Sequence, residues 1–205
     1  MSVVVLISGR GSNLQAILEA GIPVSAVISN VAGAGGLAIA TKHGVPTKVA
    51  RHGDFPTREA FEEVLAAEID QFAPNLVAHA GFMRIVTAGF VERYAGRMLN
   101  VHPSLLPSFT GLHTHERALA AGVRVHGCTV HFVTPEIDSG PIVIQAAVPV
   151  LAGDTATALA ARVLEQEHLV YPRAIGWFLD GRLVIESGRV NVRGVDAQFV
   201  FSDRS

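Results

Sequence analysis

The chain has 205 residues, of which 49% are hydrophobic and 17% are charged. This length suits one α/β domain with a full-sized core, and the apolar composition suits strands that helices cover on both faces. The 16 basic and 18 acidic residues give a formal net charge of −2. Overall charge therefore favours neither nucleic acid nor an anionic membrane as a partner.

Cys128 is the only cysteine, which excludes an intramolecular disulfide and a cysteine-based zinc site within one chain. The apolar run at residues 1–8 lacks a basic flank and is too short for a signal peptide or a membrane span. We therefore expect a cytoplasmic protein.

The first half of the chain alternates apolar runs with helical patterns. A β-branched run at 3–8 stops at a glycine turn, 9–13, and a helical pattern follows. A strand at 24–29, a helix near 37–43 and a strand at 45–50 come next. The order β-α-β-α-β predicts parallel pairing.

The stretch 58–69 is rich in helix formers, and Thr57 is its expected N-cap. Buried strands are expected at 75–81 and 98–101, with a short helix between them. Right-handed crossovers then predict a doubly wound, mostly parallel open sheet with helices on both faces. The turns 8–13, 81–86 and 100–107 would form one rim for ligands.

The second half of the chain has longer apolar runs. Strands at 128–134 and 141–150 should extend the sheet. A helix over 155–179 should bend near Pro172, and a short strand or hairpin should end the chain.

The glycine turn Gly9-Arg10-Gly11-Ser12-Asn13 could hold a phosphate, because glycine lets backbone approach a ligand at a helix N-terminus. Leu14 stands where a dinucleotide fingerprint needs glycine, and no lysine completes a Walker-type loop. The turn therefore favours a monophosphate over NAD or ATP. Alternatively, Ser12 or Asn13 only caps the helix.

Strand alternation puts Asn100 and His102 on one side of their strand. An amide donor and an imidazole suit acyl transfer to an amine, which needs oxyanion donors and a proton carrier. Asp138 lies in a turn between strands and could orient His102, or it could only form the turn. His131 could be a core histidine.

Metal and covalent catalysis are not favoured. Nine histidines are present, with His113 and His115 two residues apart, but no metal-ligand motif is found. Ser104 and Ser139 lack the surroundings of a nucleophile elbow. No metal is expected.

Four segments together resemble the phosphoribosylglycinamide formyltransferase family: residues 3–17, Gly81-Phe82-Met83-Arg84-Ile85, Asn100 to Pro107 and Gly127 to Pro141. The resemblance implies one formyltransferase domain over 1–205, with a Rossmann-like half at 1–100 that binds phosphate and nucleotide. The half at 101–205 would carry catalysis and folate binding. The implied reaction moves a formyl group from 10-formyltetrahydrofolate, a co-substrate, to the amine of glycinamide ribonucleotide.

The resemblance also implies roles for single residues. Asn100, His102 and Asp138 would be catalytic. Ribonucleotide contacts would come from Gly11, Ser12, Asn13, Gln166 and Glu167. Folate contacts would come from Arg58, Met83, Arg84, Ile85, Val86, Asn100, Thr134, Pro135, Glu136, Ile137 and Asp138. Residues 108–111 lack the lysine of many relatives, which removes one expected cationic contact.

Three other functions go with the same fold. A formyltetrahydrofolate hydrolase has an additional N-terminal domain and methionyl-tRNA formyltransferase an additional C-terminal one, and 205 residues leave room for neither. A catalytically silent folate- or nucleotide-binding protein would keep the fold. The family further implies a possible homodimer.

Overall fold

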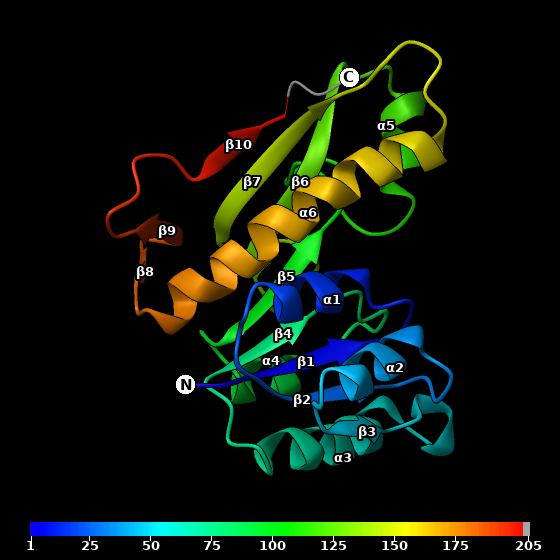
Figure 1. Ribbon diagram of the computed structural model, residues 1–205, viewed down its shortest axis with the longest axis vertical. Coiled ribbons are helices and arrows are strands. Elements are labelled where there is room, and N and C mark those ends of the chain that lie inside the picture. Colours follow the sequence, from blue (N-terminus) through cyan, green and yellow to red (C-terminus); the bar gives the residue numbers. More distant parts are fainter. Residues whose placement is uncertain (203–205) are drawn as a thin grey trace. The chain divides into compact units, whose positions relative to one another are not determined.

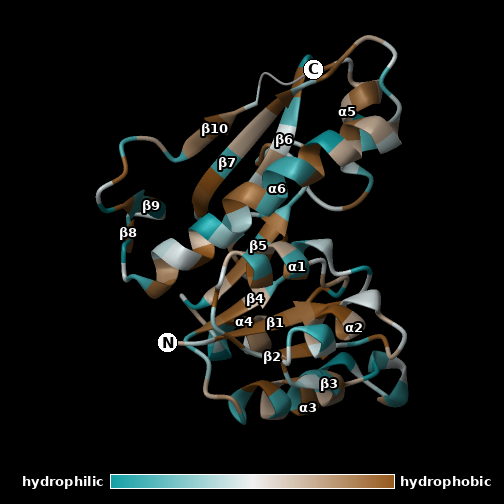
Figure 2. Cartoon of the chain, in the orientation of Figure 1, coloured by the Kyte–Doolittle hydropathy of each residue, from teal (hydrophilic) through white to brown (hydrophobic). Residues whose placement is uncertain are grey.

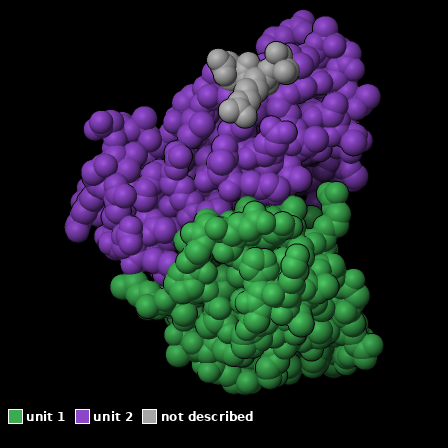
Figure 3. All heavy atoms as spheres, viewed as in Figure 1, with its two compact units in different colours: residues 1–100 green, residues 101–205 purple. Residues whose placement is uncertain are grey.

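The computed structural model describes residues 1–202 and divides the chain into two compact units, Met1–Asn100 and Val101–Ser205 (Figure 3). The sequence analysis expected one domain over 1–205 with halves at 1–100 and 101–205. The roles assigned to those halves stay a prediction.

Unit 1 alternates strands and helices, as predicted. In chain order its elements are β1 (Val3–Ile7), α1 (Ser12–Glu19), β2 (Val24–Ser29), α2 (Gly35–Lys42), β3 (Thr47–Val49), the 3-10 helix η1 (His52–Asp54), α3 (Arg58–Asp70), β4 (Leu76–His79) and α4 (Ala88–Arg93). Strand β5 (Met98–His102) follows and crosses the boundary between the units.

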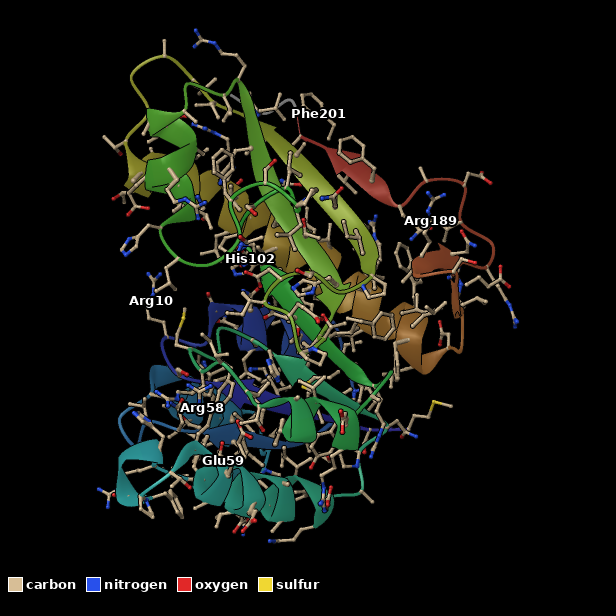
Figure 4. The ribbon with its side chains drawn as sticks, turned by 180° about the vertical axis from the view of Figure 1, so that it is seen from behind. Arg10, Arg58, Glu59, His102, Arg189 and Phe201 are labelled. Atoms are coloured by element: carbon tan, nitrogen blue, oxygen red, sulfur yellow. The ribbon has the colours of Figure 1, made fainter. Side chains whose placement is uncertain are left out.

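The strands of unit 1 form a parallel sheet in the order β5-β4-β1-β2-β3. Every residue of β1 is buried, and Figure 2 shows this strand as hydrophobic along its length. Figures 1 and 4, which view opposite sides, show α1 and α2 over one face and α3 and α4 over the other. Two-sided coverage explains why β1 reads as a continuous apolar run.

The chain order reverses between β1 and β4, which are neighbours in this sheet. From β1 the chain steps through β2 to β3, and then returns through α3 to β4 on the other side of β1. The loops that leave β1 and β4 therefore diverge to opposite faces. Such a switch point is where open α/β sheets bind ligands.

Unit 2 is built on the antiparallel pair β6 (Val125–Phe132) and β7 (Ile142–Pro149). Helix α6 (Ala156–Leu179) packs on both strands. Its other elements are α5 (Thr114–Ala120), β10 (Phe199–Phe201), which pairs in parallel with β7, and the hairpin β8 (Leu183–Glu186) and β9 (Arg189–Val192). Parallel pairs predominate in the chain, which confirms the predicted α/β class with a mostly parallel open sheet.

Several local expectations need correction. The strand expected at 45–50 covers only Thr47–Val49, an edge strand with little burial. Helix α5 and strand β10 were not predicted, because their apolar patterns are short. The helix expected over 155–179 is present as α6, with Pro172 inside it, and the bend expected there stays a prediction. The N-cap of α1 is Gly11, so neither Ser12 nor Asn13 caps that helix.

Among residues 1–202, no helix combines the length and apolar character that crossing a bilayer requires.

Gly127 in β6 offers a test of the packing in unit 2. A Cβ at this position would overlap the carbonyl oxygen of Ala146 on β7, so the strands would have to separate. We expect Gly127→Ala to lower the free energy of unfolding by about 2–3 kcal/mol. Urea unfolding followed by circular dichroism measures this change.

Gly176→Ala is the matched control, because a Cβ there meets nothing within 4 Å and the residue lies inside α6. Replacing a helical glycine by alanine should stabilise the protein by about 0.5–1 kcal/mol. Equal unfolding midpoints for the two variants would contradict the packing described for β6 and β7.

Candidate active site

His102 and Asp138 lie together in unit 2, although 36 positions separate them in the sequence. His102 ends strand β5, and Asp138 lies in the connection between β6 and β7. The His102 Nδ1 is 3.4 Å from the Asp138 Oδ2, and only 7% and 11% of the two side chains are exposed. The proximity that the sequence could only suggest is therefore present in the structure.

Both nitrogens of the His102 ring face hydrogen-bond acceptors. Nε2 lies 3.0 Å from the carbonyl oxygen of Phe109, and Nδ1 faces the Asp138 carboxyl. A carbonyl oxygen can only accept, so Nε2 carries a hydrogen in this arrangement. The site thus holds an imidazole with one N–H directed at an oxygen and a carboxylate at its other side.

The backbone holds Asp138 in place. Its φ of 51° is left-handed, a conformation that aspartate tolerates better than most residues. The Asp138 Oδ2 accepts a hydrogen bond of 2.7 Å from the amide of Gly111. Position 140, two residues later, requires glycine, because a Cβ there would overlap the carbonyl oxygen of Phe132. A hollow of about 200 Å³ borders the carboxylate, between Leu106, Pro107, Thr110 and Ile142.

His131 approaches Asp138 from strand β6. Its Nε2 is 3.8 Å from the Asp138 Oδ1, and its Nδ1 donates to the carbonyl oxygen of Phe132 at 2.8 Å. Burial lowers the pKa of His131, and the Phe132 carbonyl and the Asp138 charge only partly offset this effect. His131 is therefore the buried strand histidine that the sequence suggested, with Asp138 as a neighbour.

The turn after His102 is tied to the sheet by two polar residues that the sequence analysis did not single out. The Thr129 hydroxyl donates to the carbonyl of Ser104 at 2.7 Å and accepts from the amide of Leu106 at 3.0 Å. Gln145 Nε2 donates to the Leu106 carbonyl and to Thr129. Polar residues inside two apolar strands were the available signal for this role.

Two further histidines flank the segment that contains Phe109. The rings of His115 and His126 are 5.3 Å apart, and the Phe109 ring contacts His126 at 5.8 Å. Burial, and then the nearby His115, lower the pKa of His126 to about 4; burial also lowers the pKa of His115. Burial thus favours the neutral form of both rings, and they act as packing partners.

The serines considered as nucleophiles, Ser104 and Ser139, each hydrogen-bond to a nearby backbone carbonyl. The Ser104 hydroxyl donates to the Ser108 carbonyl, and the Ser139 hydroxyl donates to the Ile137 carbonyl. Both hydroxyls therefore stabilise turns. Within the described residues 1–202, no group of three histidine, cysteine or acidic side chains is arranged to hold a metal ion.

The glycine turn of unit 1 is packed tightly against α2. Gly11 has a φ of 85°, and a Cβ there would overlap the Cα of Gly36. The Gly36 amide donates to the carbonyl of Gly9 at 3.1 Å. The backbone of the turn is thus fixed at the N-terminus of α1, and that terminus has the positive end of the helix dipole.

The predicted folate residues of unit 1 lie in three places. Met83 and Ile85 follow β4 and expose 70% and 54% of their surface, while Arg84 and Val86 are half-buried. Arg58 is the exposed first residue of α3 (Figure 4). Asn100 ends unit 1 on β5, two residues before His102 and opposite His79 of β4.

The predicted ribonucleotide residues of unit 2 lie on α6. Gln166 and Glu167 are 5% and 7% exposed, which is unusual for side chains of this polarity. The charge of Glu167 contributes to raising the pKa of Cys128 on β6 and of Tyr171 one turn later on α6, after burial itself. The Cys128 thiol and the Tyr171 hydroxyl therefore both lie near the Glu167 carboxylate. The segment Thr134–Ile137, predicted to contact folate, leads into Asp138, and Ile137 is 49% exposed.

Comparison with known proteins agrees with this architecture. Residues 1–175 match the model of the formyl transferase family. Phosphoribosylglycinamide formyltransferase of Escherichia coli (strain K12) is 53% identical over 189 residues, which are 89% of each chain. The crystal structure of glycinamide ribonucleotide transformylase 1 from Symbiobacterium toebii superposes with a TM-score of 0.92 at 47% identity, covering 94% of this chain and 93% of that one.

The chain is also 46% identical over 195 residues to the trifunctional purine biosynthetic protein adenosine-3 of Bos taurus, and it spans 19% of that protein's length. The family match, the likeness over most of the chain and the shared fold confirm the resemblance that the four sequence segments indicated. This chain belongs to the formyl transferase family.

Proposed function

We propose that this chain transfers the formyl group of 10-formyltetrahydrofolate to the amine of glycinamide ribonucleotide, a step of purine biosynthesis. The His102–Asp138 pair carries the proposal, since it supplies an N–H donor and a carboxylate in one buried site. The high identity to a phosphoribosylglycinamide formyltransferase supports the same substrates. We also propose that the protein works in the cytoplasm.

In the proposed mechanism the substrate amine attacks the formyl carbon directly. The formyl oxygen becomes an oxyanion, and the His102 Nε2–H donates a hydrogen bond to it. In this structure the same N–H donates to the Phe109 carbonyl. On substrate binding, the formyl oxygen would replace the Phe109 carbonyl as the acceptor of this hydrogen bond. Asn100 would donate a second hydrogen bond.

Collapse of the tetrahedral intermediate breaks the bond between the formyl carbon and the folate nitrogen. The attacking amine loses a proton and the folate nitrogen gains one, so the reaction needs no net acid or base. Asp138 lies beside His102 and would support the ring while it carries this proton. Proximity and fixed dipoles then supply the catalysis, with no covalent enzyme intermediate and no metal.

The substrate anchors come from residues in each unit. We propose that Gly11, Ser12 and Asn13 bind the phosphate, because the glycine turn presents a helix N-terminus. Gln166 and Glu167 would contact the rest of the ribonucleotide. The folate would contact the segment Met83–Val86, Arg58, and residues 134–138. A homodimer remains a family-level proposal.

The test of this function is an assay of the purified protein with 10-formyltetrahydrofolate, followed by absorbance of the deformylated folate. Turnover that depends on glycinamide ribonucleotide supports the transferase. Deformylation without it would indicate a hydrolase, and saturable binding of both ligands without reaction would indicate a silent binding protein. Either of the last two results would overturn the proposal.

Replacing His102 by alanine should lower kcat by roughly 10²- to 10⁴-fold, because the oxyanion loses a donor and the proton loses a carrier. The dissociation constant of the ribonucleotide should change by less than about twofold, since its proposed anchors are elsewhere. Steady-state kinetics and calorimetric titration measure the two quantities. His43→Ala, a change on the exposed surface, is the control. Near-wild-type turnover by His102→Ala would sink the mechanism.

Asp138→Asn tests the carboxylate separately. The amide oxygen can still accept from Gly111, so the loop should keep its conformation while the charge beside His102 is lost. We expect kcat to fall by about 10²-fold and the pH dependence of the rate to change shape. An unchanged pH profile, measured from pH 5 to 9, would count against a role for Asp138 in supporting His102.

A further inference from the structure

The segment 81–87 of unit 1 combines exposed apolar side chains with firmly held ends. Met83 and Ile85 are 70% and 54% exposed, and no helix or strand contains them. The segment leaves β4 at the switch point of the sheet, beside the end of β1. Large exposed apolar residues on a loop whose ends are held by hydrogen bonds are typical of a ligand-binding surface.

Ser8, the residue after β1, holds the beginning of this segment with two hydrogen bonds. The Ser8 amide donates to the carbonyl of Gly81 at 3.2 Å, and the Ser8 hydroxyl accepts from the amide of Met83 at 2.8 Å. Gly81 adopts a φ of 74°, and Phe82 is buried with its ring 5.4 Å from that of His79. The chain therefore turns at Gly81 and is fixed on both sides of Phe82.

A directional chain of hydrogen bonds orients the Ser8 hydroxyl. Because this hydroxyl accepts from Met83, its own hydrogen is available to the Asn30 Oδ1, 2.6 Å away. The Asn30 Nδ2 then lies 3.2 Å from the His52 Nδ1, which can accept. Asn30 is only 4% exposed. Each group has its donor or acceptor role determined by its neighbour, so the hydroxyl has little freedom to rotate.

Glu62 holds the other end of the segment. This carboxylate lies on α3 and is 5% exposed, and its Oε1 accepts from the Thr87 amide at 2.8 Å. Its Oε2 accepts from the Thr87 hydroxyl. The same hydroxyl caps α4 by accepting from the Phe90 amide. Both oxygens of this buried carboxylate thus bond to a single loop residue. A carboxylate is costly to bury without such partners.

We infer that Ser8 and Glu62 are positioning residues that hold the backbone of residues 83–86 in the conformation that receives the formyl folate. The inference rests on the proposed function. Neither side chain needs to touch the ligand, because each acts through a backbone group of the loop. Holding a loop in its bound conformation improves affinity by removing the cost of ordering it.

Ser8→Ala is the first test. The change leaves the Met83 amide and the Asn30 carbonyl without their partner, while the backbone bond to Gly81 remains. We expect the KM for 10-formyltetrahydrofolate, and the Kd for an unreactive deaza analogue, to rise about tenfold. The KM for the ribonucleotide and kcat should stay within about twofold of wild type. Hydrogen exchange of the Met83 amide should become faster.

Ser25→Ala is the matched control. The Ser25 hydroxyl makes a single hydrogen bond to backbone, donating to the Val3 carbonyl at 3.3 Å, and it lies near the beginning of β2, whereas Asn30 follows the end of that strand. Loss of the Ser25 hydroxyl should change none of these quantities by more than about twofold. Comparing the two serine variants at equal folded fraction, checked by urea unfolding, separates positioning from general stability.

Glu62→Gln tests the second anchor with a side chain of the same shape. One amide oxygen can still accept from Thr87, so the protein should fold, with a folate Kd raised about threefold or more. Unchanged folate KM in both folded variants, or an equal rise in the KM of both substrates, would overturn the inference. Unchanged exchange of the Met83 amide in Ser8→Ala would also overturn it. Absence of folate binding by the wild-type protein would instead refute the proposed function, and the inference would fall with it.

Discussion

The reversal of strand order between β1 and β4 is the constraint on which unit 1 depends. Parallel strands require crossover helices, and the two directions of crossover send α1 and α3 to opposite faces of the sheet. The loops after β1 and β4 are therefore neighbours, joined by the hydrogen bond from the Ser8 amide to the Gly81 carbonyl. The glycine turn and the exposed segment with Met83 and Ile85 both begin there, which gives this unit a place for ligands.

In unit 2 the main constraint is a carboxyl group, that of Asp138, which lies beside apolar strands. The Asp138 carboxyl is mostly buried, and it is held by the Gly111 amide with His102 and His131 on either side. Burial of a carboxylate is costly unless hydrogen bonds and charge partners compensate. The connection between β6 and β7 carries Asp138, and its partners come from the end of β5, from the loop before α5 and from β6. One of these partners, His102, is the catalytic histidine of our proposal.

A common device holds the loops of both units. A buried or half-buried polar side chain on a strand or helix bonds to the backbone of a loop: Thr129 and Gln145 hold the turn after His102, and Glu62 holds Thr87. Such bonds satisfy loop backbone groups without regular secondary structure. They also fix the loop relative to a rigid element, as precise positioning of a substrate requires.

The sequence by itself determined the α/β order, the parallel sheet of unit 1 and the identity of His102, Asn100 and Asp138 as candidates. Apolar periodicity, glycine turns and four motifs in a constant order are local signals, and they persist whatever the chain contacts later. Helix α5 and strand β10 escaped prediction because their patterns are short. Only the tertiary structure brought Asp138 to His102 and Met83 to Ser8, since these pairs lie 36 and 75 residues apart. A polar residue's partner across such distances depends on how strands and loops pack, which no local pattern specifies.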